Sequence, residues 1–158
     1  MNILLARIDD RFIHGQVVTR WVKEYPAERL IVVSDAVAAD ELRKSLLISV
    51  APSSMTANVV SVDKMIKAYH SPRYEGVSAF LLFEKPRDVL RLIEGGVKID
   101  SVNVGGMRFE NDREQVTKSV SVTADDIVAF KALQALGIRQ ELRQLPSDSA
   151  VDFMTKLK

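Results

Sequence analysis

Residues 7–17 gather the side chains of this chain that are best suited to chemistry. They read RIDDRFIHGQV and hold one histidine, two arginines and two aspartates. The segment follows a short apolar run, and a helical pattern begins at residue 15. We therefore expect His14 in a loop after a strand and at a helix N-terminus, where free amide groups and the helix dipole favour an anion.

A neutral imidazole can act as a nucleophile, and a phosphoryl group bound to it needs fixed positive charge nearby. Arg11 is the best candidate to supply that charge, and Arg7 is a second. The local chemistry thus predicts a phosphohistidine site at His14. The alternative is that His14 only caps the helix, while the arginines pair with Asp9 and Asp10 in a surface network.

Two aspartates and three backbone amides complete the predicted site. Asp9 and Asp10 would repel a phosphate placed beside them, so we expect one of the two to orient an arginine or the imidazole. We rank Asp10 with His14 and Arg11 as catalytic, and Asp9 in the second rank. Hydrogen-bond donors toward phosphate are expected from the start of the helix, at the amides of Gly15, Gln16 and Val17.

Two other motifs contain residues that could be functional. Gly105 and Gly106 end an apolar run, and a glycine pair lets the backbone approach a ligand or take a positive φ. A tight turn is the alternative explanation. His70 precedes Pro72 at the end of a helical pattern, where the helix dipole favours a histidine, so we expect it to be structural.

Short β-rich runs alternate with amphipathic stretches along the whole chain. This pattern predicts an α/β protein in which residues 1–158 form a single domain, with a mostly parallel central sheet of about seven strands and helices on both faces. The expected strands are residues 2–7, 29–34, 57–62, 77–83, 101–105, 118–122 and 138–143. The expected helices are residues 15–24, 37–50, 63–70, 86–94, 124–136 and 149–156. Within the second helix, Leu42, Leu46, Leu47 and Val50 are expected to form a buried stripe.

Composition narrows the class of protein. The chain has 158 residues, 47% apolar content and a net charge of +1, as an ordinary globular domain has, and 6% aromatic residues give no reason to expect nucleic acid as a partner. Cysteine is absent and there are two histidines, so we expect chemistry without a metal. Neither glycine-rich nucleotide fingerprint occurs, so no nucleotide cofactor is expected. The start of the chain lacks a signal-peptide pattern, and no segment approaches the ~20 apolar residues of a membrane span, which favours a cytoplasmic location.

Residues 7–17 closely resemble the signature of the IIB subunits of the mannose/fructose/sorbose family of the bacterial phosphoenolpyruvate-dependent sugar phosphotransferase system. The resemblance continues through residues 31–35 with 40–42, through 86–96 and through 102–108, and it covers essentially the whole chain. In that family, a small polar or acidic pair closes the second strand near the reactive histidine, and a Gly-Gly-Met loop lies beside it. The resemblance therefore places Asp35 and Gly106 in the second rank of the site, together with Arg7.

The resemblance implies that this chain is a phosphocarrier. His14 would accept a phosphoryl group, on Nδ1 if it follows the family, from the phosphohistidine of a IIA partner and pass it to a sugar translocated by the membrane subunits IIC and IID. The protein would be cytoplasmic and associated peripherally with the membrane permease. The alternative is a non-catalytic α/β module that binds a phosphorylated ligand, with His14 as a hydrogen-bond donor.

Several properties stay open from the sequence. The transported sugar is not determined, and neither is the formation of a homodimer, although a start at Met1 and an end at Lys158 favour a free subunit. The family usually has Lys-Thr-Pro where this chain has Glu84-Lys85-Pro86, which puts in doubt any hydroxyl contact to phosphate at that turn.

A carrier has to present its histidine to partner proteins, and this bears on the two apolar residues before it. We expect at least one of Phe12 and Ile13 to be exposed as the centre of a small interface, with Arg11 and Arg20 on its rim. The alternative is that both side chains anchor the loop in the core.

Overall fold

The computed structural model describes residues 1–15 and 17–157. A seven-stranded sheet with the order β3-β2-β4-β1-β5-β8-β9 forms its centre. All neighbouring strands in it are parallel except β9, which pairs antiparallel with β8. The strands are β1 (Asn2–Asp9), β2 (Arg29–Val33), β3 (Thr56–Val60), β4 (Ser78–Phe83), β5 (Ser101–Gly106), β8 (Arg139–Leu142) and β9 (Val151–Asp152). The α/β class and the mostly parallel sheet are therefore confirmed.

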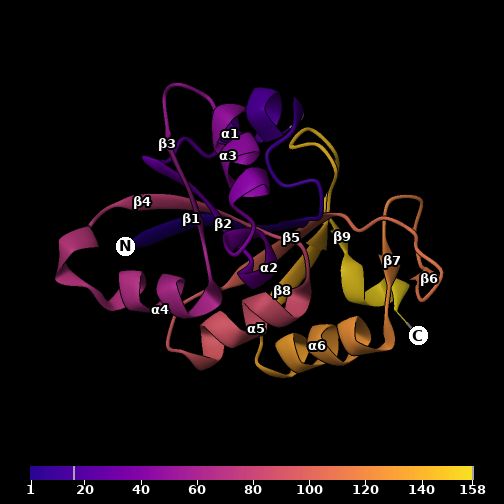
Figure 1. Cartoon of the computed structure of the whole chain (residues 1–158). Helices are drawn as coiled ribbons and strands as arrows, with labels where there is room; N and C mark the ends of the chain where they lie inside the picture. The colour runs from indigo at the N-terminus through magenta and orange to yellow at the C-terminus, as the bar shows by residue number, and fades with distance from the viewer. Residues whose placement is uncertain (16, 158) are drawn as a thin grey trace.

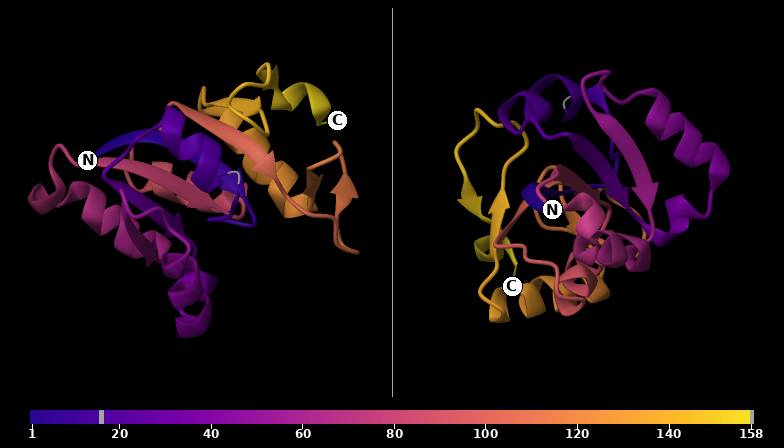
Figure 2. Two further views of the ribbon diagram at one scale, coloured as in Figure 1. Left: turned by 90° about the horizontal axis from the view of Figure 1, so that it is seen from above. Right: turned by 90° about the vertical axis from the view of Figure 1, so that its left-hand side faces the viewer.

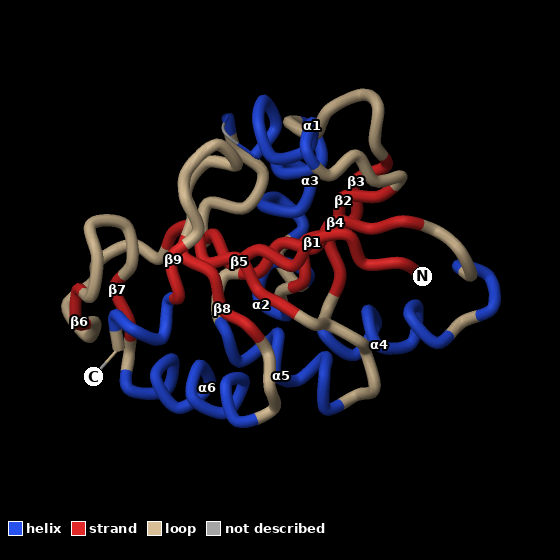
Figure 3. The backbone as a smooth tube through the Cα atoms, turned by 180° about the vertical axis from the view of Figure 1, so that it is seen from behind, coloured by secondary structure: helices blue, strands red, loops and turns tan. Residues whose placement is uncertain are grey.

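Helices cover both faces of this sheet (Figure 1 and, from behind, Figure 3). One face carries α4 (Val62–His70), α5 (Pro86–Glu94) and α6 (Ala124–Ala135), and the other carries the π-helical η1 (Val17–Trp21), α1 (Val22–Glu24) and α3 (Glu41–Ser49). The short α2 (Asp35–Ala38) precedes α3, and two 3-10 turns are η2 (Pro72–Tyr74) and η3 (Phe153–Lys156). No helix in the described part of the chain is long and apolar enough to cross a membrane.

Strand alternation divides the buried apolar side chains into two cores. In β4, Leu81 and Phe83 join the core under α4, α5 and α6, whereas Phe80 and Leu82 join the core under η1 and α1. Successive side chains of a strand point to opposite faces, so a strand covered on both sides reads as a continuous apolar run. The carboxyl ends of β1, β2, β4 and β5 meet at one edge, which brings together the loops that follow them.

Two of the expected elements near the C-terminus are wrong. The segment 118–122 does not join the central sheet, because only β7 (Ser121–Val122) is a strand and it pairs with β6 (Glu114–Gln115) in a separate antiparallel hairpin. The segment 149–156 is not one helix. Its first part supplies β9, which pairs with Glu141 and Leu142, and η3 then places Phe153 in the core.

The helix expected at residues 37–50 is divided, and its buried stripe is wrong. Asp40 accepts a hydrogen bond from the Arg43 amide at 3.1 Å and starts a new helix, α3. Leu42, Leu46 and Val50 are 71%, 58% and 52% exposed, and no residue of α3 is fully buried. The helix stands at the periphery of the molecule beside the edge strand β3 (Figure 2), so only one side of it meets the sheet.

Candidate functional site

Asp9, the last residue of β1, is the centre of a cluster at the carboxyl edge of the sheet. Its buried Oδ2 accepts a hydrogen bond from Arg7 Nη2 at 3.1 Å and lies 3.0 Å from His14 Nε2. Its Oδ1 accepts from Arg11 Nε, also at 3.1 Å. One carboxylate therefore joins the histidine to both arginines of the segment.

The ionisation state of Asp9 determines which ring nitrogen of a neutral His14 carries the proton. Burial raises the pKa of Asp9, but hydrogen bonds from His14 and Arg11 and the charge of Arg7 outweigh it and lower the pKa to about 2. An ionised carboxylate only accepts hydrogen bonds, so Nε2 of a neutral His14 carries the proton. The lone pair is then on Nδ1, which is the atom that the family resemblance implies.

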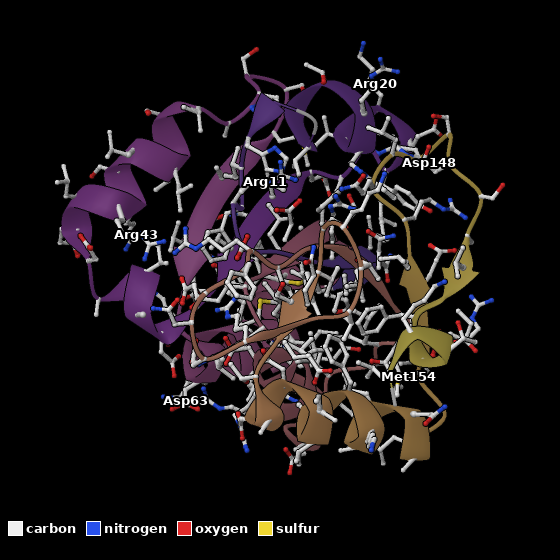
Figure 4. All side chains as sticks on the ribbon, turned by 90° about the vertical axis from the view of Figure 1, so that its right-hand side faces the viewer. Arg11, Arg20, Arg43, Asp63, Asp148 and Met154 are labelled. Carbon is white, nitrogen blue, oxygen red and sulfur yellow. The ribbon has the colours of Figure 1, made fainter. Side chains whose placement is uncertain are left out.

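The two arginines have different surroundings. The Arg11 side chain is 51% exposed beside the histidine, and Figure 4 labels it in the upper central part of the view. Arg7 is fully buried, with its guanidinium 4.5 Å from the centre of the Trp21 ring. A phosphate at the surface can therefore meet Arg11, whereas Arg7 lies beneath the site.

Arg7 is held on the side away from His14 by strand β5 and by the loop after β8. Nη1 donates to Asn103 Oδ1 and to the carbonyl oxygen of Arg143 at 3.0 Å, and Nη2 donates to the carbonyl oxygen of Gln144 at 3.2 Å. Trp21 Nε1 donates to the same Gln144 oxygen at 2.8 Å. The loop after β8 is thus part of the support of the site.

Asp10 has a different role from Asp9. Its amide donates to the Gly106 carbonyl oxygen at 3.1 Å, and its Oδ2 accepts from the Arg108 amide at 2.8 Å. Arg113 Nη1 lies 3.7 Å from the same carboxyl group. Asp10 therefore connects the loop before His14 to the loop after β5. Of the two aspartates it is Asp9 that contacts the imidazole, so the expected rank of Asp10 above Asp9 is reversed.

The expectation that Phe12 or Ile13 is exposed is wrong. Phe12 is 1% exposed and Ile13 is 3% exposed, and both pack in the core under η1 and α1. Phe12 also has a φ of 57°, a left-handed conformation that few residues other than glycine adopt. The two side chains are anchors of the loop, as the alternative stated, and His14 remains 17% exposed between them and the helix.

The glycine pair serves the interior of the site. A Cβ atom at Gly105 would overlap the Arg7 guanidinium, and one at Gly106 would lie 3.5 Å from Asp9 Oδ1 and 3.6 Å from Arg11. Neither glycine has a positive φ. The close approach that the sequence suggested is therefore to the buried arginine of the protein itself.

The helix start is described in part. Gly15 is exposed and accepts a hydrogen bond from Thr19 Oγ1 at its carbonyl oxygen, and the side chain of Val17 is buried. Gln16 lies outside the described residues.

Two candidates from the sequence have contacts elsewhere. Asp35 accepts hydrogen bonds from the Val62 amide at 2.9 Å and from Arg91 at 2.8 Å, and none of its described contacts reaches His14. His70, the last residue of α4, places Nε2 2.8 Å from the Gly95 carbonyl oxygen, as expected for a structural histidine. At the turn after β4, Glu84 Oε1 accepts from the Ser34 hydroxyl at 3.0 Å.

Sequence analysis missed Trp21, Asn103 and the carbonyl oxygens of Arg143 and Gln144. Asn103 had a usable signal, because it is a polar residue within an otherwise apolar strand. Trp21 had a weaker one, a large aromatic side chain one turn of helix after the reactive loop. The carbonyl oxygens had none, since every residue carries one.

The chain is similar over its full length to characterised proteins. Residues 3–158 match the model of the family described as PTS system sorbose subfamily IIB component. The fructose-specific EIIB component of Bacillus subtilis (strain 168) is 65% identical over 158 residues, which are 100% of this chain and 97% of that protein. The mannose-specific EIIAB component of Escherichia coli (strain K12) is 57% identical over 154 residues, which are 98% of this chain and 48% of that protein.

Solved structures agree with these relatives. The crystal structure of the IIBSor domain of the sorbose permease from Klebsiella pneumoniae matches with a TM-score of 0.96 and 45% identity, over 99% of this chain and 96% of that one. A structure described as phosphoenolpyruvate-dependent phosphotransferase system matches with a TM-score of 0.96 and 65% identity, over 99% and 98% of the two chains. The chain belongs to the sorbose subfamily of PTS IIB components.

Proposed function

We propose that this protein carries a phosphoryl group on His14 within a sugar phosphotransferase system. The observation that carries the proposal is the contact between Asp9 Oδ2 and His14 Nε2, with the half-exposed Arg11 beside it. An ionised carboxylate on one ring nitrogen directs the lone pair of the other ring nitrogen outward, and the arginine can neutralise an anion that arrives there.

The transfer step follows from this geometry. The Nδ1 lone pair of His14 attacks the phosphorus of a donor phosphohistidine, a new P–N bond forms, and the P–N bond to the donor imidazole breaks with its electron pair remaining on the donor. The His14 ring keeps its proton on Nε2 and gains positive character, which Asp9 stabilises by its negative charge. In the second step a sugar hydroxyl attacks the phosphorus and its proton passes to water, while the P–N bond to His14 breaks and its electron pair returns to Nδ1.

The cations and donors around the phosphate have distinct roles in this proposal. Arg11 contacts phosphate oxygens, and the buried Arg7 holds the Asp9 carboxylate in position by a hydrogen bond. The amides of Gly15, Gln16 and Val17 add donors at the helix start. Asp10 supports the loop, and Gly106 leaves space beside Asp9 and Arg11.

The names of the relatives suggest the partners. One relative is named an EIIAB component, so a IIA unit and a IIB unit occur in one protein, and a related structure is named a domain of the sorbose permease. We propose that residues 1–158 form one IIB domain that receives the phosphoryl group from a IIA partner. It delivers the group to a sugar bound by IIC and IID membrane subunits, and it acts in the cytoplasm at the surface of that permease. The sugar and a homodimer are left open.

The proposal is tested by phosphoryl transfer. The protein is incubated with phosphoenolpyruvate, the general phosphocarrier proteins and a IIA protein, and its mass is measured. We expect one added phosphoryl group that is labile in acid and stable in base, as a phosphoramidate is. His14→Gln should abolish the mass gain with an unchanged fold, and His70→Gln should retain it. Retention of the label in His14→Gln, or an acid-stable label, would contradict the proposal, and reversible binding alone would support a ligand-binding module.

A further inference from the structure

A row of polar side chains, of which Arg7 and Asn103 are buried and Glu141 is partly exposed, crosses three neighbouring strands beneath the site. Arg7 of β1 pairs with Asn103 of β5, and Asn103 pairs with Glu141 of β8, so the three residues are in register. Asn103 is 1% exposed and interrupts an apolar strand. A buried amide costs stability unless its hydrogen bonds are made, so its presence in the sheet needs an explanation.

The row closes into a ring of hydrogen bonds. Asn103 Nδ2 donates to Glu141 Oε2 at 3.4 Å, and Arg143 Nη2 donates to Glu141 Oε1 at 3.0 Å. The Arg143 carbonyl oxygen then accepts from Arg7 Nη1, which also donates to Asn103 Oδ1. Because Glu141 takes the amide NH₂ group, the amide oxygen must face Arg7.

This ring determines where Arg7 can direct its other nitrogen. With Nη1 held by Asn103 and the Arg143 carbonyl oxygen, the planar guanidinium directs Nη2 toward Asp9 Oδ2 at 3.1 Å. The same oxygen meets His14 Nε2 at 3.0 Å. The orientation of the imidazole is thus linked by consecutive contacts to an amide on the next strand.

We propose that Asn103, acting through Arg7, is a positioning residue that keeps Asp9 Oδ2 on His14 Nε2 and leaves Nδ1 free to accept the phosphoryl group. This inference rests on the proposed function of His14. Asn103 touches none of the reacting atoms, and its effect is on the tautomer and orientation of the histidine. Glu141 and Arg143 fix the direction of the Asn103 amide.

The tautomer of His14 is measured directly in the unphosphorylated protein. Two-bond ¹H–¹⁵N NMR correlations of ¹⁵N-labelled histidine distinguish the two neutral tautomers, and His70→Gln assigns the two rings. We expect a single Nε2–H tautomer for His14 in the wild-type protein. Asn103→Leu, which is similar in volume and cannot accept from Arg7, should give a mixture of tautomers and slow phosphoryl acceptance about tenfold.

Two further variants separate positioning from stability. Asn103→Asp keeps an acceptor for Arg7 and should restore the single tautomer and most of the rate. Gln140→Met removes another buried amide, from the neighbouring strand, whose Nε2 donates to the Phe130 carbonyl oxygen in the opposite core. It should lower the melting temperature and leave the His14 tautomer unchanged. If Asn103→Leu does not fold, Asn103→Ser is used, because its side chain is too short to reach Arg7.

The outcomes are distinct. A folded Asn103→Leu or Asn103→Ser protein with the wild-type tautomer and rate would overturn the proposal, and so would an equal change of tautomer in Gln140→Met. Failure of the wild-type protein to accept a phosphoryl group would instead contradict the proposed function. The tautomer measurement would still decide whether Asn103 positions His14.

Discussion

Two buried aspartates near the carboxyl edge of the sheet have opposite surroundings. Asp9 is 0% exposed and accepts hydrogen bonds from Arg7 and Arg11, and His14 Nε2 lies 3.0 Å from the oxygen that Arg7 contacts. Asp88, in the first turn of α5, is 2% exposed, and its Oδ1 lies 3.5 Å from Arg91. Its Oδ2 is buried without a hydrogen-bond partner among the described residues.

The pKa values of the two carboxyl groups move in opposite directions. For Asp9, burial is outweighed by its hydrogen bonds and by the charge of Arg7, and the pKa falls to about 2. For Asp88, burial outweighs the charges of Lys85 and Arg91, and the pKa rises to about 6. At similar burial, Asp9 stays ionised at neutral pH because hydrogen-bond donors surround it. Asp88 has fewer donors and takes up a proton near pH 6.

Removal of the Asp9 carboxylate should have the largest effect on stability. Asp9→Ala leaves the buried Arg7 without its counterion, and we expect the free energy of unfolding in urea to fall by about 3–5 kcal/mol at pH 7. Asp88→Ala is the matched control and should cost clearly less, because one carboxylate oxygen has no hydrogen-bond partner among the described residues and the other has only the 3.5 Å contact with Arg91. Equal losses would show that the two sites do not differ as described.

The same contrast has a pH dependence. The native pKa of Asp9 lies below its ordinary value of 3.8, so its ionised form stabilises the fold above about pH 4. That stabilisation is lost as the pH falls from about 4 to 2. Urea unfolding between pH 2 and pH 5 measures it. The loss of stability should be smaller in a variant that lacks Asp9, and what remains comes from other carboxyl groups with a lowered pKa, such as Asp35.

A further prediction compares Arg11, which contacts Asp9, with Arg91, which lies beside Asp88. Arg11→Lys keeps the charge but loses the planar guanidinium that can engage two phosphate oxygens, so phosphoryl acceptance should slow by about ten- to a hundredfold, or about 1.4–2.7 kcal/mol in barrier. Arg91→Lys, in the cluster of Asp88, should leave the rate unchanged. Rapid-quench measurement of His14 labelling distinguishes them. An unchanged rate in Arg11→Lys would move the phosphate contact to backbone amides.

The smallest effect on the free energy of unfolding is expected at Asp88, where the pH dependence has the opposite sign to that of Asp9. The native pKa of about 6 exceeds the ordinary 3.8, so the protein loses stability as the pH rises from about 4 to 6. Asp88→Asn resembles the protonated form and should raise the free energy of unfolding by about 1–2 kcal/mol at pH 7.5. Below pH 4 it should have little effect. A loss of stability at pH 7.5 would show that the Asp88 carboxylate is satisfied.

Local patterns predicted the loop that contains His14 and most of the sheet. His14 was placed at the end of a strand and before a helix because strand runs and helix starts are encoded in neighbouring residues. Which of Asp9 and Asp10 contacts the imidazole depends on the residue at which β1 ends. The strand was expected to end at residue 7, but it continues to Asp9, and residues two apart on a strand share a face, as Arg7 and Asp9 do.

Contacts between distant segments were beyond the sequence pattern. The periodicity of Leu42, Leu46 and Val50 showed an apolar side of a helix, but periodicity does not show whether another element covers that side. The expected exposure of Phe12 or Ile13 is wrong for the same reason. Three hydrogen-bond partners of Arg7, at Asn103, Arg143 and Gln144, are 96 to 137 residues away along the chain, so nothing near Arg7 in the sequence indicates them.

The burial of Phe12 has a consequence for the motions of the loop. The amides of Asp10, Arg11 and Phe12 are all hydrogen-bonded, and Phe12 and Ile13 lie in the core. The loop therefore cannot open by a small local fluctuation, because opening would withdraw two large apolar side chains into water. Amide hydrogens of this loop should exchange with solvent about as slowly as those of β1, and His14 is held on a rigid support.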